Sequence, residues 1–411
     1  MKKLLMGLLA AGLVIAMTVP AMAFDSEFGV YWRTRAYMQE NFTGSDTEAK
    51  DVQQVDTRTR LFYTAVFSED FKFVNAFEFN NTWGDTVGGD IGTDGTGIFR
   101  IKHSYANFNL GPVNFLIGLQ PRVLHRGFVF SDDFAGAAIT FKGEGFQIPF
   151  IWMKAYEGGT GKDKNDFDVD YYALKPEFTF GGAKITPTLT YIYSKNASAW
   201  APLSGNKEVK VWLAGVDADV KLGAGSFWFT GIYEGGDVDL VAPAGKSVDV
   251  EAYLLALGGA FNMGPADIHG QVFYATGDDK TSEDYEQFFI PKGQSYYWAE
   301  IMGFGIFDNQ ASAGSPADQI GNIMAANIGA GFKASDKLKL TADLWYAKLA
   351  EDNAAGDSDL GTEIDLVMTY SLMKNLNLDV VAAYLFAGDA TYKGANDKDA
   401  YEIGTQLSFR F

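Results

Sequence analysis

The sequence ends in YEIGTQLSFRF, residues 401–411, and polar and apolar side chains alternate along most of this stretch. A period of two is typical of a β-strand with one face in apolar surroundings and the other in water. We therefore predict that the chain ends in a strand. Its apolar positions are Tyr401, Ile403, Leu407, Phe409 and Phe411, and its polar positions are Glu402, Gln406, Ser408 and Arg410.

Similar alternation recurs toward the N-terminus in segments of roughly 10–15 residues, and no long amphipathic helix is indicated after residue 24. Short, turn-like connections alternate with longer, acidic ones. The short connections contain Gly, Pro, Asp or Ser, which tight hairpins favour. They lie at 68–70, 110–112, 143–145, 181–183, 223–225, 263–265, 335–337 and 373–375. The longer ones lie at 41–52, 84–96, 125–136, 158–166, 197–207, 238–247, 277–320, 351–359 and 388–398.

Short turns at one end and long loops at the other are typical of transmembrane β-barrels. Eight turns join sixteen strands, and one strand before 41–52 and one after 388–398 bring the count to 18. The fold prediction is therefore an all-β, antiparallel, up-and-down barrel. A hairpin hidden in 277–320 would raise the count to 20, and two misassigned weak strands would lower it to 16.

Aromatic residues repeat beside the short turns, as in the girdles at membrane interfaces. Examples are Phe67, Phe71, Phe108, Phe141, Phe146, Phe178, Phe180, Phe227, Phe261 and Phe332. A soluble exported β-sandwich or β-helix is the alternative, and it explains the alternation and the many glycines. It does not explain the two classes of loop.

Residues 1–23 have the pattern of a cleaved secretory signal peptide. Lys2 and Lys3 precede an apolar run, and Ala21-Met22-Ala23 forms the cleavage motif. We therefore expect one mature domain, 24–411; an uncleaved membrane anchor is the alternative. With 33 basic and 52 acidic residues, the full chain carries a net charge of −19, which disfavours nucleic-acid binding. The chain has no Cys, which excludes disulfides and thiolate metal ligands.

The terminal Phe411, with apolar residues at alternate positions before it, resembles the last strand of bacterial outer-membrane proteins. With the signal peptide, it makes the whole mature chain resemble an outer-membrane porin. Strand count and loop style are similar to the 18-stranded group of alginate exporters and substrate-specific channels of pseudomonads. This resemblance implies an outer-membrane location, passive transport of small solutes or ions, and recognition of the last strand by the barrel-assembly machinery.

The arginines are unevenly distributed, because seven of the eight precede residue 127. Alternation places most of them on polar strand faces, and a lipid-facing Arg at the bilayer midplane costs about 2–4 kcal/mol. We therefore predict a basic wall inside the barrel that favours anions. Its pore-lining residues are Arg33, Arg35, Arg58, Arg60, Arg100, Lys102, Arg122 and Arg126.

Two other interpretations of the arginines stay open. In the first, the basic wall faces an acidic one across a constriction, which gives mild selectivity. The acidic candidates are Glu157, Asp217, Asp219, Asp343 and Asp365. In the second, the arginines only pair with Asp56 and Glu78 within the wall.

Two loops are candidates to narrow the pore. Loop 125–136 combines aromatic and acidic residues, and we predict that it folds inward as a constriction loop through Phe128, Phe130, Asp132 and Asp133. Loop 277–320 is the longest, so a functional or mobile role is expected. It could enter the lumen, cap the mouth or continue the strands above the membrane.

Catalysis, metals and cofactors have little support. His103, His125 and His269 show no metal-ligand spacing, and no EF-hand pattern is present. We predict no enzyme activity, no metal and no cofactor. The expected partners are lipid, lipopolysaccharide and small solutes, with homo-oligomerisation left open. The rival functions are a structural barrel that sheaths a polymer-export machine or cytochrome conduit, and a surface receptor or adhesin.

Overall fold

The computed structural model describes residues 24–44, 51–92, 98–159, 165–279, 281–392 and 398–411, so the expected signal peptide lies outside the described residues. The described strands are β1 (Asp25–Glu40), β2 (Val52–Ser68), β3 (Phe71–Thr82), β4 (Ile98–Leu110), β5 (Val113–Leu124), β6 (Phe130–Gly143), β7 (Phe146–Tyr156), β8 (Val169–Leu174), β9 (Glu177–Phe180), β10 (Ala183–Ser194), β11 (Asn206–Leu222), β12 (Gly225–Leu240), β13 (Ser247–Met263), β14 (Ala266–Ala275), β15 (Ile323–Lys333), β16 (Leu338–Lys348), β17 (Asp359–Met373), β18 (Leu376–Ala387) and β19 (Ala400–Arg410). The described 3-10 turns are η1 (His125–Gly127), η2 (Asn165–Phe167), η3 (Ala197–Ala199) and η4 (Ala201–Leu203).

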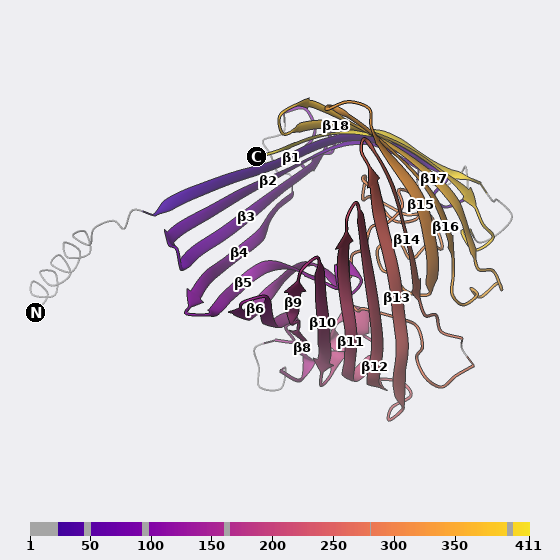
Figure 1. The fold of residues 1–411 in the computed structure, drawn as a ribbon. Helices are drawn as coiled ribbons and strands as arrows, with labels where there is room; N and C mark the ends of the chain where they lie inside the picture. Colours follow the sequence, from indigo (N-terminus) through magenta and orange to yellow (C-terminus); the bar gives the residue numbers. More distant parts are fainter. Residues whose placement is uncertain (1–23, 45–50, 93–97, 160–164, 280, 393–397) are drawn as a thin grey trace, which may run out of the picture.

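These strands close into one antiparallel barrel (Figure 1). The last strand, β19, pairs back with β1, from Tyr31↔Arg410 to Glu40↔Tyr401. Strands β8 and β9 both pair with β7 and β10, so together they fill one position in the wall. Pro176, which lacks an N–H to donate, lies between them. The 19 strand segments therefore make 18 barrel positions, and the predicted count is confirmed.

All eight predicted short turns join consecutive strands, because turn residues and register are local properties. The longer connections alternate with them as expected. One predicted boundary is wrong: the connection predicted at 125–136 spans only 125–129, because residues 130–136 continue the ladder with β5. The described part of 276–322 forms none of the barrel strands, so the hidden hairpin is not seen there.

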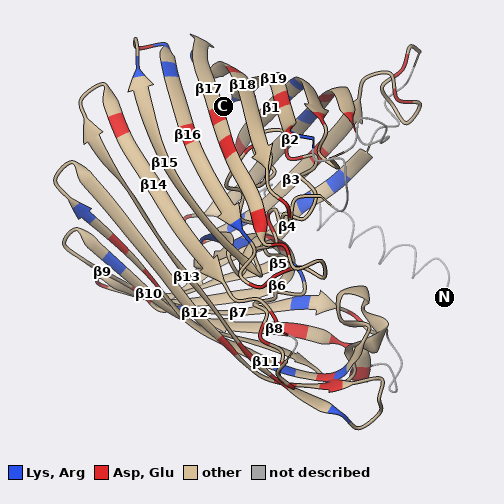
Figure 2. Ribbon diagram, turned by 90° about the vertical axis from the view of Figure 1, so that its right-hand side faces the viewer, with Lys and Arg blue, Asp and Glu red and all other residues tan. Residues whose placement is uncertain are grey.

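The outer face of the barrel is apolar. Along β13, Leu255 and Leu257 are 48% and 54% exposed, whereas Leu254 and Ala256, which alternate with them, are buried. Most of the length of the strands is uncharged (Figure 2). Predicted girdle residues such as Phe67, Phe227 and Phe332 are exposed as well. In a soluble sandwich these rings would be core residues, whereas a continuous exposed apolar band fits a barrel in a lipid bilayer.

Among the described residues, none forms a helix with the length and apolarity needed to span a membrane.

The β5–β6 hairpin bends out of the wall. Strands β5 and β6 stay paired up to Leu124↔Phe130, but β4 pairs with β5 only up to Leu119, and β7 pairs with β6 only up to Gly136. Gly118 and Gly136 face each other where the wall contacts end. Gly118 has a φ of +127°, and a Cβ added there would lie 2.4 Å from the carbonyl oxygen of Ser104. Glycine is therefore required where the hairpin turns inward.

Gly136→Val tests this bend. A Cβ at Gly136 would lie 2.0 Å from the backbone oxygen of Trp152, which cannot move without breaking the ladder. We expect a loss of about 1–3 kcal/mol in the free energy of unfolding. The measurement is a urea titration of the folded barrel in detergent, followed by tryptophan fluorescence. The control is Gly205→Val, because no atom lies within 4 Å of that position; equal stability of both variants would contradict the prediction.

Candidate functional site

The tip of the β5–β6 hairpin crosses the barrel interior and docks on β11 and β12. His125 Nδ1 lies 3.2 Å from a carboxylate oxygen of Asp217, and Arg126 Nη2 lies 2.9 Å from Asp219. The Arg126 guanidinium also lies over the Trp228 ring, 4.9 Å from its centre. Gly215 leaves room for this contact, because a Cβ there would lie 2.6 Å from the imidazole of His125. The tip is thus held by both charge and shape.

The four residues predicted for the constriction loop lie on two sides of this hairpin. Phe128 is fully buried and stacks on Tyr296, with ring centres 3.9 Å apart, and Phe130 is buried as well. Asp132 is exposed. One carboxylate oxygen of Asp133 accepts a hydrogen bond from Lys102 at 2.5 Å. The other oxygen lies 2.9 Å from the imidazole of His103. The Asp133 carboxylate therefore ties the hairpin to β4 at a point where β4 and β5 are no longer paired through their backbones.

The second element inside the barrel is the described part of residues 276–322, which we call the inner segment. Its backbone meets the hairpin where Ser131 N–H donates to the Gly293 carbonyl at 2.8 Å. The Gln294 side chain bridges Phe128 O at 2.7 Å and Ile320 O at 2.9 Å. Of the three placements that the sequence left open for 277–320, entry into the lumen is the one observed. The hairpin and the inner segment form one packed unit.

The middle of the inner segment, at residues 300–302, is anchored on acidic residues of β17. The carboxylate of Glu363 accepts hydrogen bonds from the backbone N–H groups of Ile301 at 2.6 Å and Met302 at 2.8 Å. Asp365 accepts another from the N–H of Glu300 at 3.3 Å. Because these donors are backbone groups, the acidic wall holds the inner segment without any side-chain cation at these contacts.

A few residues further on, Phe307 and Asp308 are anchored on the arginines of β1 and β2. The carboxylate of Asp308 lies 3.0 Å from an Nη of Arg33 and 3.6 Å from an Nη of Arg58, and it also pairs with Arg35. Arg35 donates to the Phe307 carbonyl at 2.5 Å. Asp308 therefore lies where three guanidiniums converge.

The remaining partners of the arginine cluster lie in the wall itself. Arg35 binds Asp56 with two nitrogens, at 2.6 and 2.9 Å, and Arg60 lies 2.6 Å from Glu78. Arg33, Arg35, Arg58 and Arg60 thus face Asp56, Glu78 and Asp308, and four cations less three anions leave one positive charge. Arg33, Arg35 and Arg58 border a cavity of about 290 Å³.

The other predicted basic residues are less uniform. Arg100 is exposed and borders the same cavity, and it forms no ion pair with another described residue, so it adds a second positive charge. Arg122 is half-buried, and its Nε and one Nη lack a hydrogen-bond partner among the described residues. A bulge at Lys102 shifts the register of β3 and β4, so that Lys102 and the next residue, His103, both reach Asp133. Arg126 belongs to the hairpin tip. The pore-lining role of this set stays a prediction.

Further acidic residues lie on and beside β16 and β17, and only β18 and β19 stand between β17 and β1. Glu300, Asp343 and Asp365 border a second cavity of about 400 Å³, which is also lined by His269. The imidazole of His269 lies 3.0 Å from Asp343. Two further predicted residues, Asp217 and Asp219, are used by the hairpin tip. Glu157 lies elsewhere and pairs with Lys154. No cluster of His, Asp and Glu suited to a metal ion occurs among the described residues.

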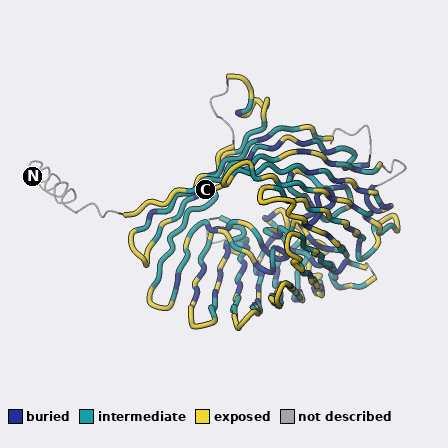
Figure 3. Tube along the Cα trace, turned by 45° about the horizontal axis from the view of Figure 1, so that its top comes forward, coloured by how far each residue is buried: buried dark blue, intermediate teal, exposed yellow. Residues whose placement is uncertain are grey.

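The interior also contains an apolar core, which the sequence analysis did not predict. Inward residues of β7 to β13, such as Ile151, Ile192 and Leu254, are almost fully buried. They belong to the same cluster as Phe128 and Phe288 of the two inner elements. Figure 3 shows these buried positions inside, with exposed turns at the rim. The available signal was the run of aromatic residues in 285–298, because such rings need a covering surface.

The whole chain resembles solved bacterial outer-membrane channels. OccK11 (OpdR) of Pseudomonas aeruginosa gives a TM-score of 0.60 at 10% identity, over 94% of this chain and 96% of that one. A BenF-like porin from Pseudomonas fluorescens Pf-5 gives 0.60 at 15% identity, over 94% and 98%. OpdK of Pseudomonas aeruginosa, solved with vanillate, gives 0.59 at 13% identity, over 95% and 100%.

These structural similarities confirm that the chain has the predicted fold, which is that of the 18-stranded channels of pseudomonads. No protein-family model matches the chain, and no curated protein matches it by sequence.

Proposed function

We propose that this protein is an outer-membrane porin through which small polar or anionic solutes diffuse passively. The apolar outer band supports a membrane location, and the shared fold with outer-membrane channels supports a transport role. The N-terminal 23 residues would direct export, which leaves 24–411 as the mature barrel. Lipid, lipopolysaccharide and, through the strand that ends in Phe411, the barrel-assembly machinery are the proposed partners.

The preference for anions rests on the charge balance of the arginine cluster. Arg33, Arg35, Arg58 and Arg60 carry one positive charge more than their carboxylate partners, and Arg100 adds another. Guanidinium groups bind carboxylates with paired donors. Asp308 supports the proposal, because a carboxylate of the chain itself already occupies this cluster. The carboxylate of a solute would meet the same donors.

A weakly selective pore is the second candidate. Glu300, Asp343 and Asp365 lie near the basic wall, since only β18 and β19 separate β17 from β1, and acidic residues beside basic ones favour neither ion strongly. The rival role as a sheath for a polymer or a cytochrome has less support. The hairpin and the inner segment pack across the interior, which leaves little room for a folded or polymeric occupant.

Reversal potential in a planar bilayer tests the proposal. The refolded protein is inserted, and current is recorded under a tenfold salt gradient. We expect steady channel currents and a reversal potential with the sign that marks anion selectivity. A reversal potential near zero would favour the weakly selective pore, and folded barrels without current would contradict the porin function.

A further inference from the structure

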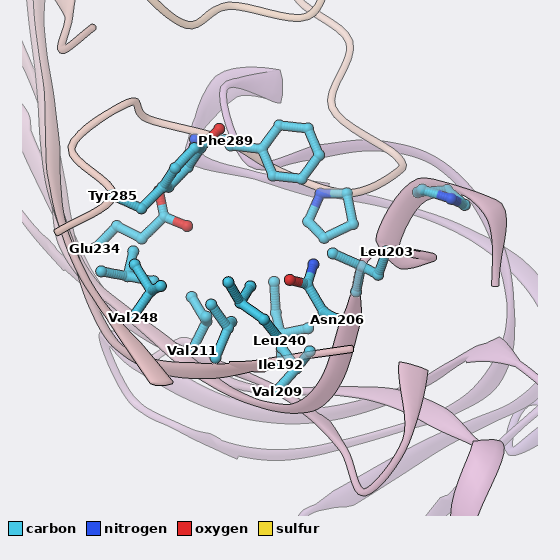
Figure 4. A pocket seen from close by; sticks show the side chains of 14 residues that line it. Ile192, Leu203, Asn206, Val209, Val211, Glu234, Leu240, Val248, Tyr285 and Phe289 are labelled. Atoms are coloured by element: carbon cyan, nitrogen blue, oxygen red, sulfur yellow. The ribbon is translucent and has the colours of Figure 1, made fainter. Parts of the chain in front are cut away.

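An apolar cavity of about 430 Å³ lies between the inner segment and the ends of β10 to β13 that carry the longer loops. Val211, Val250 and Leu240 of the wall line it, and Phe289 of the inner segment covers it (Figure 4). The inner segment is fixed here by β13, because Tyr285 N–H donates to Asp249 O at 2.8 Å. The volume and the lining are those of a small-molecule site.

One acidic group, Glu234, points into this apolar space (Figure 4). Its side chain is only 3% exposed. One carboxylate oxygen accepts the Phe289 N–H at 3.1 Å, and no cationic side chain of the described residues acts on the carboxylate. A buried carboxylate without a cation is costly. The site therefore gains stability from any ligand that brings a positive charge to Glu234.

A second polar group defines the length of the site. Asn206 lies on the far side of the cavity from Glu234, with valine and leucine side chains between them (Figure 4). An amide both donates and accepts hydrogen bonds. A ligand that matches this cavity therefore has a charged end, an apolar body and a far end where the cavity tolerates a polar group.

We infer that this cavity binds a small organic cation, a primary amine on an apolar body. The ammonium group donates to the free oxygen of Glu234, and the body fills the space lined by Val211, Leu240 and Phe289. Such a ligand contacts both the wall and the inner segment, so it holds the inner segment in place. The site is separate from the arginine cluster, and its existence does not depend on solute passage.

Phenethylamine is the probe, titrated calorimetrically into the folded protein in detergent, with protein-free micelles subtracted. We expect saturable binding of one equivalent. 2-Phenylethanol has the same body without the charge. Its affinity should be lower than that of phenethylamine by about tenfold or more. Phenylacetate should not bind at this site. Equal affinity for the amine and the alcohol would overturn the inference.

Two variants locate the binding. Glu234→Gln should weaken phenethylamine binding by about tenfold or more, because a charged hydrogen-bond acceptor is lost. Val211→Phe keeps the carboxylate and fills the cavity, so it should abolish binding as well. The control is Glu251→Gln, which removes an exposed carboxylate of β13 beside the same part of the wall. Unchanged binding in both folded cavity variants would overturn the inference.

Discussion

Replacing residues 299–308 of the inner segment by a short glycine–serine linker should raise the single-channel conductance several-fold. This part of the chain reaches from β17, where Glu363 binds its backbone, to β1, where Arg33 binds Asp308. It therefore runs along the inner side of β18 and β19, between the acidic residues of β17 and the arginines of β1. A flexible linker makes none of these contacts, so more of the cross-section fills with water.

The control for this deletion is the same linker in place of residues 352–357, which form an exposed turn between β16 and β17. That variant should conduct like the unmodified protein. Both proteins need a circular dichroism spectrum of a folded barrel before insertion into bilayers. If conductance stays unchanged after the deletion, the ions take a path that avoids the inner segment.

The barrel could be predicted from sequence because its signals are local. Each short turn carries its own Gly, Pro, Asp or Ser, and each strand carries its own alternation. Because the predicted strand count is even, the first and last strands run antiparallel and can pair, which closes the barrel through β19 and β1. The outward-facing aromatic residues were predictable as well, since they lie next to the turns.

The interior could not be predicted in the same way, because its contacts join residues far apart in the chain. Asp308 binds Arg33 and Arg35, and Gln294 binds Phe128, across more than 150 positions. Alternation also fails at bulges: Lys102 and His103 are consecutive, yet both reach Asp133. The inward bend of β5 and β6 depends on Gly118 and Gly136, and in a strand pattern such glycines only indicate an irregularity.

Changing Arg33, Arg35, Arg58 and Arg60 together to Gln should shift the reversal potential strongly toward cations. The cluster now carries four cations and three carboxylates, which is +1; without the arginines, Asp56, Glu78 and Asp308 leave −3. Charges that line a pore set its ion preference. The measurement is the reversal potential under a salt gradient, and Arg410→Gln, at the exposed end of β19, is the control.

Two smaller changes separate selectivity from loss of folding. Unpairing a buried carboxylate such as Asp56 or Glu78 costs about 3–5 kcal/mol. The quadruple variant carries this risk, and Arg33→Gln with Arg58→Gln avoids it, since Arg35 still binds Asp56 and Arg60 still binds Glu78. That double variant should shift the potential in the same direction, by less. Asp308→Asn removes one anion and gives four cations against two, so it should shift the potential toward anions. Shifts of the same sign from Asp308→Asn and the arginine variants would show that the charge of this cluster does not set the ion preference.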